Sequence, residues 1–378
     1  MSWKIITEET GKLTNKKVLL RLDLNVPLSD GKIVDNFKIE KVLTTIGFLQ
    51  KEGAKIIILS HLGGDGQKSL LPVCEYLKKF FVVSFLTDIF SDEGRKKISG
   101  LQAGEIVVLE NLRRYAGEKE NNSDFTKQLA SLGDLYVNEA FAVSHRHHSS
   151  IVGLPQLLKS FGGPEFAKEI KELANISQTG FPRLFILGGN KLQTKIPFIE
   201  KFLEMADFVL VGGALANDFF KAQGLEIGES LASQERIVSD DLLQNKKIIL
   251  PEDVVVAGHQ GVSIKKPKAV KKDERIVDVG PQTLRTWRDL IKNSKFALWN
   301  GPLGDYLNGF SEATFELIRA LTDNKIEVIA GGGDTEHCIS QLGLEEKFDF
   351  ISTGGGAMLE FVATGTLAGI EALNNSPL

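Results

Sequence analysis

The sequence predicts an α/β protein with two doubly wound, Rossmann-like parallel-sheet domains joined by a hinge helix. Short aliphatic runs alternate with longer amphipathic stretches along the chain, a pattern typical of parallel sheets covered on both faces. The 378 residues are also too many for one ordinary core. We expect a first domain at 1–161, the hinge helix at 162–175 and a second domain at 176–360. The last segment, 361–378, is expected to return to the first domain.

The first half contains four strand-like runs, at 18–26, 54–63, 105–112 and 134–141. Amphipathic stretches between them, such as 37–53 and 124–133, predict helices.

Polar residues follow these strands, at the edge of a parallel sheet where ligands bind. They are Asp23, Asn25, His61, Arg113 and Arg146. Each alone fits a turn or a solvated charge, but together they indicate a small-anion site. Neighbouring side chains in the HRHH run at 145–148 diverge, which disfavours a metal site there.

The stretch 162–173 has no strand signal, so we interpret it as a glycine break followed by the connecting helix. Strands then resume, and most of them end in paired or tripled glycines. We place them at 182–189, 207–213, 247–254, 296–304, 328–335 and 348–356, with an exposed loop at 262–273. Repeated glycines at strand ends predict a phosphate site lined by backbone N–H groups.

The run VIAGGGDT, at 328–335, is the clearest of these strand ends. A strand that breaks into glycines at a helix start exposes N–H groups to a phosphate. Asp334 would then anchor the Mg²⁺ of a nucleotide, since Mg²⁺ needs only one or two protein carboxylates. The alternative is a tight turn in which Asp334 is the N-cap of the helix.

Two lysines follow the first glycine pair of the second half. Lys191 and Lys195 have helical spacing, so both ammonium groups can face a phosphate as mobile charges or remain on a solvated face. Asn300 and Pro302 form another rigid, polar strand end.

Composition excludes several classes of protein. A net charge of −4 argues against nucleic acid as a partner. Cys74 and Cys338 are too far apart in sequence and context to suggest a disulfide framework or zinc. Because neither a signal sequence nor a long apolar run is present, we expect a cytoplasmic protein without a membrane partner.

The chain resembles the phosphoglycerate kinase family. VLLRLDLNVPL, SHLG, LENLR, NEAF, LGGNKLQTKI, FVLVGGALANDFF, WNGPLG, AGGGDT and ISTGGGAMLEF occur in that family's order over nearly the whole chain. The resemblance implies reversible phosphoryl transfer between 1,3-bisphosphoglycerate and ADP, giving 3-phosphoglycerate and ATP, across a hinged cleft. We expect a monomer that acts on these small molecules with Mg²⁺.

The resemblance also implies roles for individual residues. On the 3-phosphoglycerate side it places Asp23, Leu24, Asn25, Lys38, His61, Leu62, Gly63, Gly64, Arg113 and Arg146. On the nucleotide side it places Gly189, Lys191, Lys195, Gly213, Asn300, Pro302, Leu307, Gly332, Gly333, Asp334 and Thr335, with Asp334 as the metal ligand. The expected catalytic groups are Lys38, Lys191, Lys195, Gly354 and Gly355.

Three positions depart from the family's pattern. Lys38 and Gly64 stand where the family has arginines, and Leu307 stands where it has an acidic residue for the ribose. Glu139 replaces an Asp, which is a milder change. Two alternatives therefore remain: a kinase of the same fold for another small carboxylate, or a catalytically silent nucleotide-binding homologue.

Overall fold

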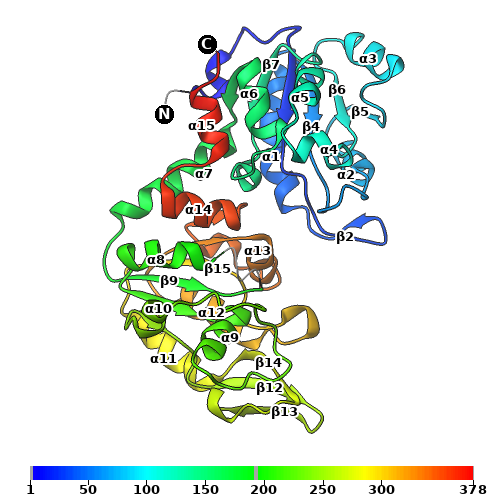
Figure 1. The fold of residues 1–378 in the computed structure, drawn as a ribbon. Helices are drawn as coiled ribbons and strands as arrows, with labels where there is room; N and C mark the ends of the chain where they lie inside the picture. Colours follow the sequence, from blue (N-terminus) through cyan, green and yellow to red (C-terminus); the bar gives the residue numbers. More distant parts are fainter. Residues whose placement is uncertain (1–2, 191–194, 378) are drawn as a thin grey trace. The chain divides into compact units, whose positions relative to one another are not determined.

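The computed structural model describes residues 3–190 and 195–377. The chain divides into two compact units (Figure 1): one contains the residues up to Glu172 and the segment from Thr364, and the other is Leu173–Ala363. The boundary between Glu172 and Leu173 falls inside helix α7, Pro164–Ala174.

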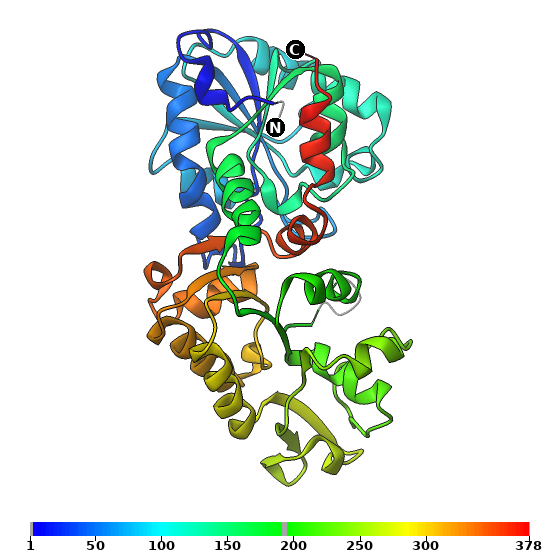
Figure 2. The same ribbon diagram turned by 90° about the vertical axis from the view of Figure 1, so that its left-hand side faces the viewer.

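The first unit is built on a six-stranded parallel sheet of order β5-β6-β4-β1-β7-β8. Its strands are β1 (Lys17–Arg21), β4 (Lys55–Leu59), β5 (Val83–Leu86), β6 (Ile106–Leu109), β7 (Leu135–Asn138) and β8 (Lys159–Gly162). Helices lie on both faces of this sheet, for example α1 on one face and α15 on the other (Figure 2). Such a doubly covered sheet needs strands that are apolar on both sides, and Val18, Leu19 and Leu20 of β1 are all fully buried.

The helices of this unit are α1 (Phe37–Lys51), α2 (Leu71–Leu77), α3 (Asp92–Ser99), α4 (Ala116–Lys119), α5 (Ser123–Ala130), α6 (Leu154–Leu157) and α15 (Ala368–Asn374), and β2 (Leu28–Ser29) pairs with β3 (Lys32–Ile33). The apolar residues of α1 recur three or four positions apart, which gives it one buried stripe: Ile39, Val42, Ile46 and Leu49. Helix α15 belongs to this unit although it ends the chain, and its Gly369 N donates to Ser144 O at 2.7 Å.

The second unit has a six-stranded parallel sheet of order β11-β10-β9-β15-β16-β17. Its strands are β9 (Arg183–Leu187), β10 (Phe208–Val211), β11 (Ile248–Ile249), β15 (Phe296–Asn300), β16 (Glu327–Gly331) and β17 (Phe350–Ser352). The chain winds outward from β9 in one direction and from β15 in the other. Ligands bind where such a winding direction reverses, at the carboxyl ends of the strands. This geometry points to the loops after β9 and β15.

The helices of the second unit are α8 (Ile196–Met205), α9 (Gly213–Ala222), α10 (Asp240–Gln244), α11 (Pro281–Lys292), α12 (Glu312–Asp323), α13 (Gly333–Ser340) and α14 (Gly356–Thr364). A separate antiparallel sheet of order β13-β12-β14 consists of β12 (Val254–Gly258), β13 (Gly261–Lys265) and β14 (Glu274–Val279).

The two parallel sheets confirm the predicted fold class, but four details of the sequence interpretation were wrong. Strands β5 and β8 were missed because neither is a continuous aliphatic run: β5 reads VSFL, and β8, where no strand was expected, reads KSFG. The stretch 247–254 is not one strand, since β11 covers two residues and β12 starts a different sheet. The expected loop at 262–273 contains most of β13, a five-residue strand in which even Val262 and Ile264 are exposed.

Within the described parts of the chain, no single helix has both the length and the apolar composition needed to cross a bilayer; only α14 and α15, a bent pair, reach that length and composition when they are counted together.

Candidate active site

The first unit holds a cluster of charged residues at the carboxyl ends of β1 and β4. Asp23 follows β1, and its Oδ2 lies 2.5 Å from Lys38 Nζ at the start of α1. Its Oδ1 lies 3.9 Å from Nδ1 of His61, which follows β4. Burial alone would raise the pKa of Asp23, but the charge and hydrogen bond of Lys38 outweigh it and lower the pKa to about 2. Asp23 is therefore a carboxylate at neutral pH.

Arg21, which the sequence interpretation missed, lies beneath this cluster. Its side chain is almost fully buried; Nε donates to Ser150 Oγ at 2.9 Å, and Nη2 lies 3.1 Å from His61 Nδ1. A guanidinium can only donate, so Nδ1 of His61 accepts and the imidazole proton is on Nε2. Burial, and then the charge of Arg21, lower the pKa of His61 well below its ordinary value. His61 is therefore a neutral imidazole.

Hydrogen bonds join the strand-end loops of this site. Asn25 Oδ1 accepts from Gly63 N at 2.8 Å, and Arg113 Nη1 donates to Gly63 O at 2.6 Å. Leu62 O accepts from Asn111 Nδ2 at 2.7 Å. These bonds bring together Asn25 and Arg113, which the strand pattern named, and Leu62 and Gly63, which the resemblance added. Leu24 N donates to Ser60 Oγ at 3.0 Å beside them, and Gly64 is exposed.

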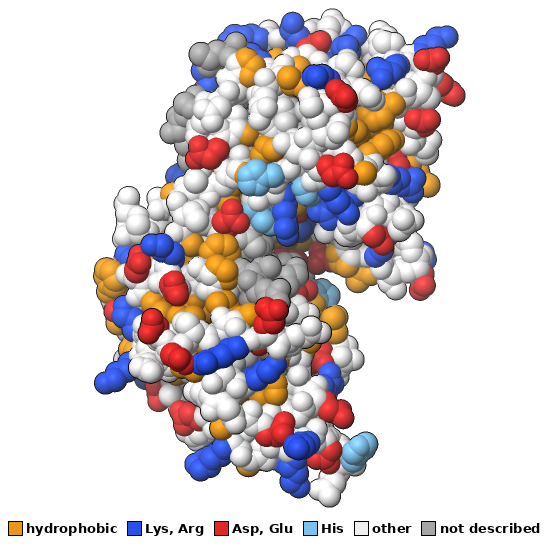
Figure 3. Space-filling view, viewed as in Figure 1, with side chains coloured by type: hydrophobic (Ala, Val, Ile, Leu, Met, Phe, Trp, Pro, Cys, Tyr) orange, Lys and Arg blue, Asp and Glu red, His pale blue; other side chains and the backbone are white. Residues whose placement is uncertain are grey.

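Positive charge is concentrated here. Burial, followed by the charges of Arg21 and Arg146, lowers the pKa of Arg113. Buried Arg113 Nε has no hydrogen-bond partner among the described residues, while Arg146 is exposed. Basic side chains and histidines gather on one part of this unit's surface (Figure 3). Crowded cations repel one another, and an unpaired donor lacks a hydrogen bond. An anion that binds beside them relieves both, so this cluster favours an anion.

In the second unit, the loops after β9 and β15 are bonded to each other. Gly188 N donates to Asn300 O at 2.9 Å, and Gly189 N donates to Pro302 O at 2.7 Å. Gly213 starts helix α9 beside them at φ +58°, and a Cβ there would lie 2.6 Å from Gly189 N. Only glycine fits this close approach. Gly213 N donates to Leu303 O at 3.1 Å, and no side chain of the N-cap residue, Gly212, covers the N–H groups that follow in the first turn of α9.

The glycine-rich end of β16 forms a second uncovered helix start. Helix α13 begins at Gly333, and its N-cap, Gly332, has φ +102° and makes no side-chain capping bond. The alternative that Asp334 is the N-cap is therefore wrong. A Cβ on Gly355 would lie 3.3 Å from Gly332 Cα, so the glycine loops after β16 and β17 lie against each other. Gly354 N in the same loop donates to Ser352 Oγ at 3.1 Å.

Two polar side chains join these loops to the one after β15. Asn300 Nδ2 donates to Gly331 O at 2.8 Å, and Thr335 Oγ1 accepts from Gly301 N at 2.8 Å. The three glycine-rich strand ends therefore form one continuous rim.

Asp334 is exposed in the first turn of α13, and its Oδ1 accepts from Tyr306 Oη at 2.9 Å. No group of three or more His, Cys, Asp or Glu side chains that could hold a metal exists among the described residues. A single accessible carboxylate beside an uncapped helix start nevertheless fits Mg²⁺, which takes most of its ligands from water and substrate phosphates.

Lys195 precedes α8 and is buried. Its Nζ donates to Gly188 O and, at 3.2 Å, to Asn300 O. The alternative of a solvated helix face is therefore wrong for Lys195, because its ammonium group is buried and two carbonyl oxygens hold it at the rim. Lys191 lies outside the described residues.

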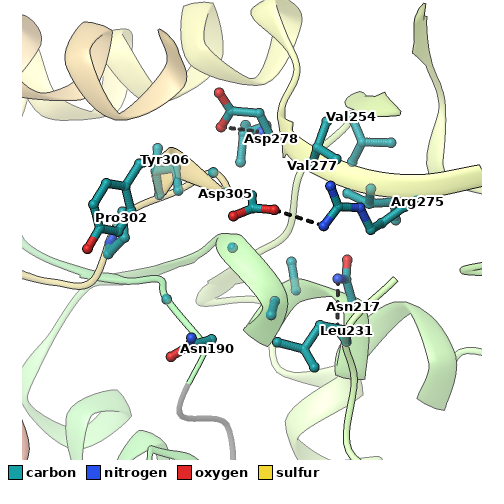
Figure 4. A pocket seen from close by; sticks show the side chains of 18 of the residues that line it. Asn190, Asn217, Leu231, Val254, Arg275, Val277, Asp278, Pro302, Asp305 and Tyr306 are labelled. Carbon is teal, nitrogen blue, oxygen red and sulfur yellow. Dashed lines mark hydrogen bonds and ion pairs between the residues drawn. The ribbon is translucent and has the colours of Figure 1, made fainter. Parts of the chain in front are cut away.

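A pocket of about 220 Å³ opens beside this rim (Figure 4). The predicted residues that line it are Gly189, Gly213, Pro302, Leu307 and Asp334. Leu307 is 78% exposed at its mouth.

Other residues of this pocket carried no signal in the sequence: Asn190, Asn217, Arg275, Asp278, Asp305 and Tyr306. Arg275 and Asp305 come from elements 30 residues apart, and their ion pair of 2.8 Å exists only in the fold. Burial raises the pKa of Asp278 to about 7.

The fold and these sites define a class: a phosphotransferase of two α/β units, each with groups at its strand ends that can bind an anion. The family model described as "Phosphoglycerate kinase" matches residues 8–365. The phosphoglycerate kinase of Wolbachia sp. subsp. Drosophila simulans (strain wRi) is 39% identical, with 97% of each chain covered. The chain belongs to the phosphoglycerate kinase family, phosphotransferases that use a carboxyl group as acceptor in glycolysis.

Two solved structures of phosphoglycerate kinases are also similar to this chain. The chain is similar to phosphoglycerate kinase from Pyrococcus horikoshii OT3, with a TM-score of 0.86 and 29% identity over 98% of each chain. The structure from Coxiella burnetii gives a TM-score of 0.75 and 34% identity over 96% of each chain.

Proposed function

We propose that the charged cluster of the first unit binds 3-phosphoglycerate and that the pocket of the second unit binds ADP or ATP with Mg²⁺, so that the chain catalyses the reversible phosphoryl transfer of its family. The observation that carries the assignment is that each unit has its own set of anion-binding groups at its strand ends. The first set is cationic, and the second is formed mainly by backbone N–H groups.

In the first unit, Arg113, Arg146 and Lys38 supply the positive charge for the phosphate and carboxylate of the substrate. His61 offers a neutral Nε2–H donor, while Asp23 keeps Lys38 in place through the 2.5 Å contact. The accepting carboxylate is already ionised at neutral pH, so the reaction needs no general base.

In the second unit, the uncapped starts of α9 and α13 offer N–H groups to the nucleotide phosphates. Asp334 is the residue that would hold Mg²⁺, which when bound neutralises charge on those phosphates. Lys195, held between two strand-end carbonyls, and the N–H groups near Gly354 and Gly355 are suited to stabilise charge on the transferring group. We propose the same role for Lys191.

A coupled assay with 1,3-bisphosphoglycerate and ADP, run beside calorimetric nucleotide binding, tests the proposal. ATP formation with kcat in the range of about 1–10³ s⁻¹ supports it. Nucleotide binding without turnover supports a silent homologue instead. Nucleotide binding with turnover of a different acyl phosphate supports a kinase for another small carboxylate.

We expect the enzyme to act as a cytoplasmic monomer on these small molecules. The net charge of −4 disfavours nucleic acid as a partner. Gel filtration with light scattering measures the oligomeric state, and a dimer would contradict this expectation.

A further inference from the structure

The pocket of the second unit differs in character between its two ends. At one end, Asn190, Pro302 and Tyr306 lie near the uncapped helix starts and Asp334 (Figure 4). At the other end, the wall includes the apolar side chains of Leu231, Val254 and Val277 (Figure 4). Under the proposed function, the phosphates of the nucleotide bind at the first end. The base binds at the second end, where its aromatic ring is removed from water.

Arg275 brings a charge to the apolar end. It comes from β14, and its Nη1 donates to Asp305 Oδ2 at 2.8 Å (Figure 4). Asp305 in turn accepts from Asn308 Nδ2 at 3.0 Å and 2.9 Å on its two oxygens. The guanidinium is thus fixed on one side, and among the described residues its side chain donates to Asp305 alone. Its remaining N–H groups are open to a ligand.

Asn217 adds an acceptor at the same end. It lies on α9, one turn after Gly213, so both face the pocket. Its Nδ2 donates to Leu231 O at 3.0 Å, which sets the amide orientation and directs Oδ1 the other way (Figure 4). Oδ1 is buried and has no partner among the described residues. A buried acceptor without a donor is unfavourable, so a ligand N–H that reaches it is favoured.

These two groups match guanine better than adenine. A planar guanidinium fits two neighbouring acceptors, and guanine presents O6 and N7 on one edge. The N1–H beside O6 is then the donor that Asn217 Oδ1 lacks. Adenine in the same position places its N6 amine, a donor, opposite the donors of Arg275. It can still bind through N7 alone.

We propose that Arg275, positioned by Asp305, is a specificity-determining residue whose guanidinium reads the purine edge and strengthens the binding of guanine nucleotides relative to adenine nucleotides. The inference rests on the proposed nucleotide site. Wild-type kcat/KM for GDP should then be within about tenfold of that for ADP. The two hydrogen bonds from the Arg275 guanidinium to guanine O6 and N7 offset much of what a site for adenine loses when it binds guanine.

The test compares GDP with ADP in wild type and in Arg275→Met. We expect the ratio of kcat/KM for GDP to that for ADP to fall by about fivefold or more in the variant, the effect of losing one bidentate base contact. Arg288→Met is the matched control, because Arg288 also pairs with a carboxylate, Glu316 at 2.6 Å, but is not among the residues lining the pocket. Its ratio should match that of wild type.

A wild-type ratio below about one tenth, or an Arg275→Met ratio that falls less than about fivefold, would overturn the inference and leave the kinase assignment intact. Absence of turnover with both nucleotides would instead contradict the proposed function. In that case, calorimetry on the same proteins without acyl phosphate decides the inference. It measures Kd for magnesium ADP and for magnesium GDP, and the preference between them is judged by the same limits as the ratios of kcat/KM.

Discussion

Lys38 Nζ lies 2.5 Å from Asp23 Oδ2, and the two side chains are only 20% and 7% exposed. The ion pair joins the first turn of α1 to the end of β1. It places the lysine that departs from the family's arginine inside the charged cluster rather than on a solvated helix face. Its ammonium group therefore supplies one of the preorganised charges of the proposed acid-binding site.

Removing the positive charge of Lys38 should lower kcat more than changing the shape of the cationic group. We expect Lys38→Ala to lower kcat by about 10² to 10³, the usual cost of losing one preorganised donor at developing charge. Lys38→Arg should retain turnover, because a guanidinium keeps the charge. Lys51→Ala, at the exposed far end of the same helix, is the control. Unchanged kcat in Lys38→Ala would remove Lys38 from the mechanism.

The contact between Arg21 and His61 predicts a particular imidazole tautomer. In ¹⁵N-histidine NMR spectra, His61 should show a protonated Nε2 and an unprotonated Nδ1 at pH 7. Because burial and then Arg21 lower the pKa of His61, this pattern should persist as the pH falls through the usual histidine range, about 6.5. The signal is assigned by its loss in His61→Gln. A proton on Nδ1, or titration near the usual value, would contradict the contact.

The metal assignment predicts that Asp334→Ala abolishes turnover but leaves the fold intact. Asp334 is exposed, and Tyr306 is the one hydrogen-bond partner of its side chain among the described residues, so its loss should cost about 1 kcal/mol or less of stability. Asp241→Ala is a matched control, because Asp241 is also exposed and also the second residue of its helix, α10. Near-normal turnover of Asp334→Ala at saturating Mg²⁺ would show that another group holds the metal.

Much of the fold followed from the sequence because parallel strands that are buried on both faces leave long apolar runs. The C-terminal edge of the first sheet was predictable for the same reason, since Asp23 and His61 interrupt such runs. Arg21 was missed because it occupies a strand position where an apolar residue is the usual choice, and its partner Ser150 is 129 residues away. A local sequence pattern cannot show a contact between residues so far apart in the chain.

The pocket of the second unit was also only partly predictable from the sequence. Its glycines were visible, because positive φ and close approach leave only one residue type possible at Gly213 and Gly332. For Lys195 the alternative of a solvated helix face was wrong, since a sequence does not show which carbonyl oxygens a lysine will meet. The antiparallel sheet that carries Arg275 was also missed, because the lysines and Pro267 between β13 and β14 give this region the composition of a loop.

The ribose should be recognised weakly. Leu307 is 78% exposed at the pocket mouth and has no group that can accept a hydroxyl hydrogen, and Asp305 is engaged by Arg275 and Asn308. We expect kcat/KM for 2′-deoxy-ADP to be within about tenfold of that for ADP, a difference of about 1.4 kcal/mol. Leu307→Glu should increase the discrimination. A penalty of several hundredfold in wild type would show that another group binds the ribose.

Glu139 predicts a pH dependence of stability. It accepts hydrogen bonds from Thr45, from Glu165 N at 3.2 Å and from Phe166 N at 2.8 Å, so it caps the start of α7. Burial raises the pKa of Glu139 to about 7, from an ordinary value of 4.5. The folded chain therefore keeps this proton after the unfolded chain has lost it. Its stabilising effect is complete below pH 4.5 and is lost as the pH rises through about 7.

Replacement of Glu139 by glutamine should remove this dependence. Between pH 4.5 and 8, the free energy of unfolding of wild type should fall by on the order of 3 kcal/mol more than that of Glu139→Gln, since each unit of pKa shift is worth about 1.4 kcal/mol. Denaturant titrations across this range measure the difference, and exposed Glu120→Gln is the control. Parallel pH profiles for wild type and Glu139→Gln would mean that Glu139 ionises at its ordinary pKa, with the three donors compensating for its burial.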